Sequence, residues 1–130
     1  AYTWGEAPRV GNIGYGAYGV IVGERVPMTR IPPLNGTVEA IYQRSSFEAS
    51  LGVRWAGPQY RLALADYADA RIPKYGTPGF FVCDLRTSFR VHDRIALGGV
   101  LENIGNAAYR YHGSSVNGGG RGFIMTLRID

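Results

Sequence analysis

Several stretches of the chain alternate regularly between apolar and polar residues. In the clearest of them the apolar positions are Phe47, Ala49, Leu51, Val53 and Trp55, and charged, polar or glycine residues lie between them. Successive side chains of a strand point to opposite faces of a sheet, so this period of two predicts β-strands. The predicted strands are residues 37–43, 47–55, 81–91, 94–102 and 123–129, preceded by the tail of another strand in residues 1–6.

The connections between the predicted strands alternate between long and short. The long connections are residues 7–30, 65–79 and 105–120, and the short ones are the turns at residues 44–46 and 92–93. Inside the first long connection only residues 18–22 read as a short strand. Antiparallel neighbours return the chain to the opposite edge at every step, so the long connections must share one end of the sheet. The sequence therefore predicts an all-β fold, an antiparallel meander of about six strands.

The charged residues inside the predicted strands all fall on the polar face. They are Glu39, Glu48, Arg54, Asp84, Arg86, Arg90, Glu102 and Arg128. An Arg or Lys that faces lipid in the middle of a membrane costs about 2–4 kcal/mol, so this exclusion is typical of the wall of a transmembrane β-barrel. Long loops on one side and short turns on the other are also typical of such barrels. A soluble β-sandwich, which alternates apolar-in and polar-out, is the alternative explanation.

Composition and charge exclude several other classes. The chain has 130 residues, with 19 Gly, 7 Pro and 9 Tyr, which favours one domain of strands and turns over a helical one. The formal net charge is +4, but the basic residues are dispersed, which argues against a nucleic-acid partner. No apolar run approaches the roughly 20 residues that a transmembrane helix needs.

The sequence contains no arrangement of residues that indicates catalysis. Its two histidines, His92 and His112, fall in a turn and a loop, and Cys83 falls in a strand, so no metal-ligand spacing is present. The run Gly118–Arg121 lacks the Lys and Ser or Thr that complete a phosphate-binding loop. We therefore expect no enzymatic activity, no metal site and no cofactor.

Loop residues are the candidates for ligand binding. Aromatic rings beside cations suit an anionic, partly aromatic ligand such as a metal chelate. The alternative is that the same side chains pack against neighbouring loops. The candidates are Lys74, Tyr75, Tyr109, Arg110, Tyr111, His112 and Arg121, for a small-molecule ligand whose identity the sequence leaves open.

Three groups of residues carry a family resemblance. They are Arg30-Ile31-Pro32-Pro33-Leu34-Asn35-Gly36; then Arg71-Ile72-Pro73 with Gly76-Thr77-Pro78-Gly79 and Asp84-Leu85-Arg86; then Leu101-Glu102-Asn103-Ile104 with Tyr109-Arg110-Tyr111-His112-Gly113-Ser114, Asn117 and Gly120-Arg121-Gly122-Phe123. In this order they resemble the end of the β-barrel of TonB-dependent outer-membrane receptors. Barrels of that family commonly end on an aromatic residue, whereas this sequence ends on Ile129-Asp130.

The resemblance implies that residues 1–130 are the C-terminal segment of a barrel in the outer membrane of a Gram-negative bacterium. The whole receptor would import a scarce ligand such as a metal chelate. Its plug domain, and the segment that engages the energy-coupling protein, would belong to a missing N-terminal part.

About six strands cannot close a barrel, because the smallest barrels use about eight strands and this receptor family uses about 22. The expected partners are therefore membrane lipid and further strands from the same chain or another one. Two other functions fit the same pattern. One is a structural β subunit that completes a barrel or an outer-membrane assembly made with other chains, and the other is a soluble all-β ligand-binding module.

Overall fold

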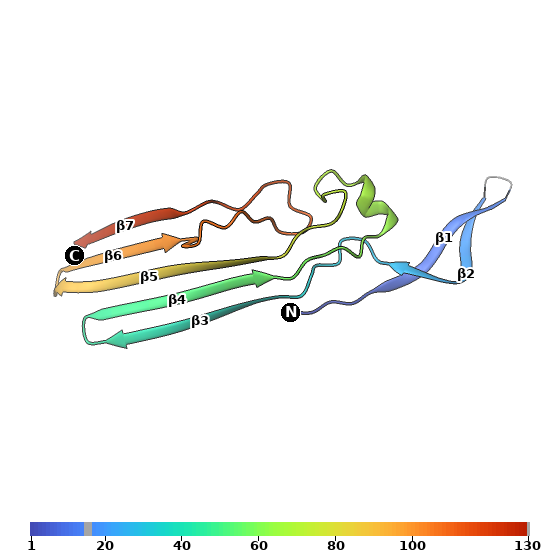
Figure 1. Ribbon diagram of the computed structural model, residues 1–130. Helices are drawn as coiled ribbons and strands as arrows, with labels where there is room; N and C mark the ends of the chain where they lie inside the picture. The colour runs from blue at the N-terminus through green and yellow to red at the C-terminus, as the bar shows by residue number, and fades with distance from the viewer. Residues whose placement is uncertain (15–16, 130) are drawn as a thin grey trace.

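A single antiparallel sheet forms the centre of the structure (Figure 1). The computed structural model describes the backbone of residues 1–14 and 17–129 and the side chains of residues 1–9 and 23–129. The strands of the sheet are β3 (Asn35–Arg44), β4 (Phe47–Ala56), β5 (Phe80–His92), β6 (Ile95–Glu102) and β7 (Gly122–Ile129). Their order in the sheet equals their order in the chain, which confirms the predicted meander with five strands in place of six.

The predicted strand tail in residues 1–6 is present only as one pair of residues. The backbone N–H of Asn35 donates to the carbonyl oxygen of Ala1 at 2.9 Å, and the amino group of Ala1 donates to the carbonyl oxygen of Asn35. No strand is assigned to residues 1–5, because the chain leaves the edge of β3 directly after this pair.

The first long connection is a β-hairpin, where the sequence predicted a loop with one short strand. Strands β1 (Glu6–Gly14) and β2 (Ala17–Pro27) pair antiparallel and project beyond the long-loop end of the sheet (Figure 1). Its base is attached to the chain that follows β4, because Arg61 forms an ion pair with Glu6 and stacks over the ring of Trp4 at 3.7 Å. Backbone pairing does not require an apolar period, and the sequence of residues 6–27 does not alternate regularly between apolar and polar residues.

The predicted faces align across all five strands of the sheet. Leu51 lies opposite Ala40 on one side and Leu85 on the other, and Leu85 in turn lies opposite Leu101. Directly opposite residues share a face, so the apolar positions form one continuous surface. We call it the apolar face: Val38, Ala40, Tyr42, Phe47, Ala49, Leu51, Val53, Trp55, Phe81, Cys83, Leu85, Thr87, Phe89, Ile95, Leu97, Gly99, Leu101, Phe123, Met125, Leu127 and Ile129.

The apolar face has no covering layer. Most of its large side chains are exposed, up to 74% for Met125, and Trp55, Leu85 and Leu101 are partly exposed. The described residues form one sheet layer, whereas a sandwich needs two sheets packed face to face (Figure 1). The few buried hydrophobic residues belong to the long-loop end of the structure, and they are Ala56, Leu62, Ala63, Ile72 and Val82.

The opposite face, which we call the polar face, carries the charges in pairs. Arg54 forms an ion pair with Asp84 at 3.1 Å, and Arg86 forms one with Glu39 at 3.8 Å. Each pair joins two different strands.

One charged residue contradicts the predicted exclusion from the apolar face. Arg44, expected in the turn, is the last residue of β3 and lies directly opposite Phe47, so it belongs to the rim of the apolar face. The turn itself consists of Ser45 and Ser46, and Ser45 adopts a left-handed backbone with φ of 47°.

Helical structure is minor. The only helix in the described part of the chain is the short 3₁₀ helix η1 (Leu64–Ala68). Among these residues no helix has the length and apolar character to cross a membrane.

The assignment of faces predicts opposite effects for two substitutions on β5. Leu85→Arg places a cation between Leu51 and Leu101 on the apolar face, where lipid exposure would cost about 2–4 kcal/mol. Ser88→Arg places the same cation opposite Glu48 on the polar face. We expect the first substitution to block assembly and the second to be tolerated, as measured by the amount of folded, membrane-extracted protein on heat-modifiability gels.

Ser88 is a better control than Ser50, which is buried and lies opposite Arg86, where a second Arg would be repelled. Equal yields of the Leu85 and Ser88 variants would show that the two faces are assigned wrongly.

Candidate functional site

The long connections meet at one end of the sheet and are tied together by buried polar groups. We refer to residues 28–34 as the first loop, residues 57–79 as the second loop and residues 103–121 as the third loop. The short turns lie at the other end of the sheet (Figure 1). The predicted grouping of long and short connections is therefore confirmed.

Asp66 joins the second loop to the first. Its side chain is 1% exposed and accepts hydrogen bonds from Thr29 Oγ1 at 2.6 Å, from the N–H of Arg30 at 3.1 Å and from the N–H of Ala63 at 2.9 Å. Burial opposes ionisation of this carboxyl, but the hydrogen bonds outweigh burial and hold the pKa of Asp66 below its ordinary value. The carboxylate is thus a fully engaged structural anchor.

Asp69 makes a second connection between the same loops. The side chain and backbone N–H of Arg71 both donate to it, and Arg30 Nε donates to it at 3.2 Å. These hydrogen bonds, with Arg71 the main source, hold the pKa of Asp69 well below its usual range. The Arg-Ile-Pro segments of the first and second loops therefore share one carboxylate.

His112 joins the third loop to the second. Its Nδ1 shares a hydrogen bond of 2.9 Å with the hydroxyl of Thr77, which is 2% exposed. Burial lowers the pKa of His112, while Asp66 and Asp69 act in the opposite direction. The Nε2 of His112 is buried and has no hydrogen-bond partner among the described residues.

Asn103 fixes the start of the third loop. It has a φ of 46°, a left-handed conformation that Asn tolerates better than most residues. Its side chain is 1% exposed and bonds to the backbone of Ala107 in both directions and to the carbonyl oxygen of Gly119. Its own N–H donates to Asp84 at 2.8 Å, and Asp84 also pairs with Arg54. One network therefore connects the third loop to the polar face of the sheet.

An aromatic cluster packs the third loop onto the end of β5. The ring of Phe80 lies 5.0 Å from the rings of Tyr109 and Tyr111, and Arg54 Cζ lies 5.7 Å from the Tyr109 ring. Gly118 passes so close to the Tyr109 ring that a Cβ at this position would lie 2.0 Å from it. The backbone N–H of Gly118 also donates to the carbonyl oxygen of Tyr109 at 2.8 Å, so the two sides of the third loop are held together here.

The candidate ligand residues divide into two groups. Tyr109, Tyr111 and His112 are engaged in the contacts described above, and Arg110 Nε donates to Asn117 Oδ1 at 2.8 Å. His112 contacts the second loop, Tyr109 and Tyr111 contact Phe80 of β5, and Arg110 bonds within the third loop.

Lys74, Tyr75 and Arg121 form the second group, which is open to solvent. Tyr75 is 84% exposed, and Lys74 Nζ lies 5.8 Å from its ring centroid. The side chain of Arg121 is exposed, while its backbone N–H donates to Asn106 Oδ1 at 3.0 Å. Of the packed group, Tyr111 also keeps about half of its surface exposed, at 49%.

A small cavity lies where the three loops meet. It has a volume of about 160 Å³ and is lined mainly by Pro32, Pro33, Thr77, Pro78, Tyr111 and His112. Its walls are mostly apolar, and the imidazole of His112 is part of its lining. The cavity therefore reflects packing between the loops.

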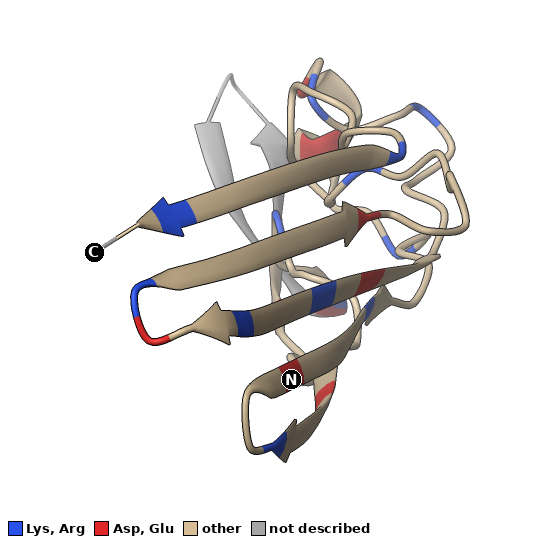
Figure 2. Cartoon of the chain, turned by 90° about the vertical axis from the view of Figure 1, so that its left-hand side faces the viewer, with Lys and Arg blue, Asp and Glu red and all other residues tan. Residues whose placement is uncertain are grey.

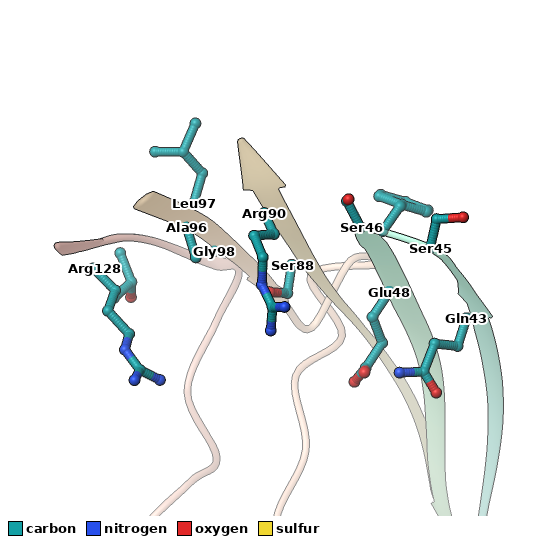
Figure 3. Close-up of a pocket in the computed structure, with 12 residues that line it drawn as sticks. Gln43, Ser45, Ser46, Glu48, Ser88, Arg90, Ala96, Leu97, Gly98 and Arg128 are labelled. Atoms are coloured by element: carbon teal, nitrogen blue, oxygen red, sulfur yellow. The ribbon is translucent and has the colours of Figure 1, made fainter. Parts of the chain in front are cut away.

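A wider groove lies at the short-turn end of the polar face (Figure 3). Its volume is about 290 Å³, and Gln43, Glu48, Arg90 and Arg128 point into it, whereas Leu97 points to the other side of the sheet. It lies far from the loops and therefore does not belong to the candidate ligand site. No group of His, Cys, Asp and Glu able to hold a metal ion occurs among the described residues.

Sequence reasoning missed the residues that hold the loops together. Asp66, Thr77 and Asn103 were seen only as members of loops or motifs, because a buried polar group is recognisable only when its partners are known. Two features of the sequence could have pointed to them. Asn103 directly follows a strand, where Asn often adopts a left-handed backbone, and Asp66 is an acidic residue in a loop that contains prolines.

Comparison with solved structures identifies the class of fold. The copper transporter OprC superposes with a TM-score of 0.65 at 20% identity, over 80% of this chain and 18% of that one. The ferric-catecholate import receptor Fiu from E. coli K12 superposes with a TM-score of 0.60 at 19% identity, over 95% of this chain and 20% of that one. No protein-family model and no curated protein matches the chain.

The chain therefore has the fold of a transmembrane β-barrel segment. The fold is that of a segment of the OprC and Fiu barrels, and it agrees with the fold that the sequence resemblance implied. The chain spans about a fifth of the length of the two receptors.

The loop contacts should loosen in acid. In the folded protein the pKa values of His112 and Asp66 lie below their ordinary values. Both groups therefore bind protons more readily when the loop contacts are broken, so the stability of the contacts decreases as the pH is lowered. We expect one loosening step as the pH falls below about 6.5 and a second below about 3.9, the ordinary values of His and Asp. A spin label on Ser115→Cys in a Cys83→Ala background would report both steps as increased mobility.

The control for this experiment is His112→Asn, whose amide can still reach Thr77 Oγ1 but does not titrate. The step near neutral pH should disappear in this variant and the acid step should persist. Persistence of both steps would contradict the role given to His112.

Proposed function

We propose that the chain is the C-terminal barrel segment of an outer-membrane receptor that imports a scarce ligand. The observation that carries the proposal is the uncovered apolar face of a single-layer sheet whose long loops interlock at one end. A soluble protein rarely exposes so continuous an apolar surface, whereas lipid covers the outer wall of a barrel. The fold shared with OprC and Fiu supports the same conclusion.

The open edges of the sheet imply further strands. The sheet ends at β3 on one side and β7 on the other, and each unpaired backbone group in lipid costs several kcal/mol. Remaining strands from the same or another chain would close the barrel. In the receptor interpretation, a plug domain and a segment that engages an energy-coupling protein belong to the rest of the molecule, and the location is the Gram-negative outer membrane.

The ligand proposed for this receptor is a metal chelate. The names of the two similar proteins refer to copper and to a ferric catecholate. The exposed Lys74, Tyr75 and Arg121 offer aromatic and cationic contacts that suit an anionic, partly aromatic chelate. Tyr109, Arg110, Tyr111 and His112 position the third loop and can contribute where their outer surfaces are accessible. Neither these residues nor their contacts suggest catalysis.

The open edges also fit a structural β subunit that completes a barrel made with other chains. The length of the native reading frame separates the two functions. Several hundred codons upstream of Ala1 favour the receptor, and a short frame favours the subunit.

The proposed topology predicts selective labelling on intact cells. An odd number of membrane crossings separates each short turn from each long loop, so the two lie on opposite sides of the bilayer. In a Cys83→Ala background, Ser115→Cys should react with an impermeant maleimide and Asp93→Cys should not. Labelling at position 93 alone would show that the topology is the reverse of the one proposed. Labelling at both positions would argue against a membrane barrier.

The proposed ligand contact predicts a selective loss of uptake. Tyr75→Ala should lower the affinity for a ferric catecholate by about two- to tenfold, because one aromatic contact contributes about 0.5–1.5 kcal/mol. Tyr67→Ala is the matched control, since Tyr67 is also exposed and lies in the same loop. The measurement is binding and uptake of ⁵⁵Fe-labelled chelate by cells with equal surface amounts of each variant. Equal affinities for the two variants would remove Tyr75 from the site.

A further inference from the structure

Arg44 has an unusual position for a charged residue. In the five-stranded sheet it is the only Asp, Glu, Lys or Arg on the apolar face, because it lies directly opposite Phe47 at the end of β3. Its side chain is exposed and has no ion-pair partner within 4.0 Å among the described residues. The ion pairs of the polar face therefore do not account for the position of Arg44.

The neighbours of Arg44 place it at a boundary between apolar and polar surroundings. Tyr42 and Phe47 lie on the same face with ring centroids 6.4 Å apart, and Phe47 lies opposite Phe89 on β5. Trp55 lies opposite Phe81 near the other end of the same two strands. Aromatic residues form two girdles at the interfaces of barrel walls, so these two groups mark the limits of the apolar band.

The length of the strand agrees with this assignment. β4 has 10 residues, and a tilted strand needs about 9–11 residues to cross the hydrocarbon core. Arg44 lies directly opposite Phe47, level with the girdle at the short-turn end, which corresponds to the boundary between hydrocarbon and lipid headgroups. A guanidinium is costly in the middle of a membrane and tolerated at its surface, so the position of Arg44 suits this depth and no deeper one.

The chemistry of the guanidinium suggests its partner. Its N–H donors match two phosphate oxygens at once, and it lacks a carboxylate partner on its own face. Basic residues gather around the short-turn ends of the strands, as the view in Figure 2 shows. On the apolar face itself, an anionic group that approaches from the membrane meets the guanidinium of Arg44.

We propose that Arg44, flanked by Tyr42 and Phe47, binds the phosphate group of a membrane lipid at the short-turn boundary of the barrel. This inference rests on the proposed function, since it requires the apolar face to lie in lipid. It adds a lipid-binding site that anchors the β3–β4 turn at the membrane surface.

The test uses the intact barrel protein that contains this chain, in nanodiscs of phosphatidylethanolamine and phosphatidylglycerol in a phosphate-free buffer. Arginine labelled with ¹³C at the guanidinium carbon is measured by solid-state ¹³C–³¹P dephasing. We expect a component that corresponds to a carbon–phosphorus separation of about 4 Å, as in a direct guanidinium–phosphate hydrogen bond. Arg44→Gln should abolish this component and Arg44→Lys should abolish it without unfolding the barrel.

The matched control is Arg90→Gln, because Arg90 lies near the same end of the sheet but on the polar face. The component should persist in this variant. Dephasing that survives in Arg44→Gln would overturn the proposal, and so would a contact between Arg44 and a carboxylate of a second, differently labelled copy.

A second readout separates this proposal from the proposed function. Lipids that carry a nitroxide in their acyl chains should broaden the methyl signals of Leu51, Leu85 and Leu127 if the apolar face lies in lipid. Broadening without phosphate dephasing overturns the lipid site and leaves the barrel function in place. Absence of both effects overturns the two together.

Discussion

The requirement that one whole face of the sheet be apolar governs this structure. The chain meets it through alternation in five strands whose register aligns the residues of the apolar face, from Val38 on β3 to Ile129 on β7. A slip of one residue between any two strands would move a set of charges onto that side. The two tight turns and the matched strand lengths preserve the register, and the environment of the apolar face then follows from its chemistry.

The long loops depend on a different interaction, the hydrogen bonding of buried polar groups. Asp66 and Asn103 have little exposed surface and are each bonded to backbone from more than one segment, so removal of either would leave donors or acceptors buried without partners. Such losses cost about 1–3 kcal/mol for each neutral group and more for charged ones. The loops are therefore parts of one connected structure, and the surface that they present to a ligand depends on all of them.

Residues that share motifs with receptor barrels have structural duties in this chain. Arg30 and Arg71 donate to the same carboxylate of Asp69, Thr77 bonds to His112, and Asn103 bonds to Asp84. The ordered motifs thus describe how the loops lock onto the sheet. Between these motifs, Lys74 and Tyr75 are exposed and take no part in these loop contacts.

The sequence by itself determined the strands of the sheet, their antiparallel order, the two faces and the ends at which long and short connections lie. These follow from a period of two and from chain continuity, which are local properties. The β1–β2 hairpin, the position of Arg44 on the apolar face, and the division of the candidate ligand residues into packed and exposed sets were decided only by the tertiary structure. Backbone pairing in a hairpin can form without an apolar period, and the face of a residue beside a turn depends on where pairing stops. The partners of Asp66, His112 and Asn103 lie in segments that only folding brings together.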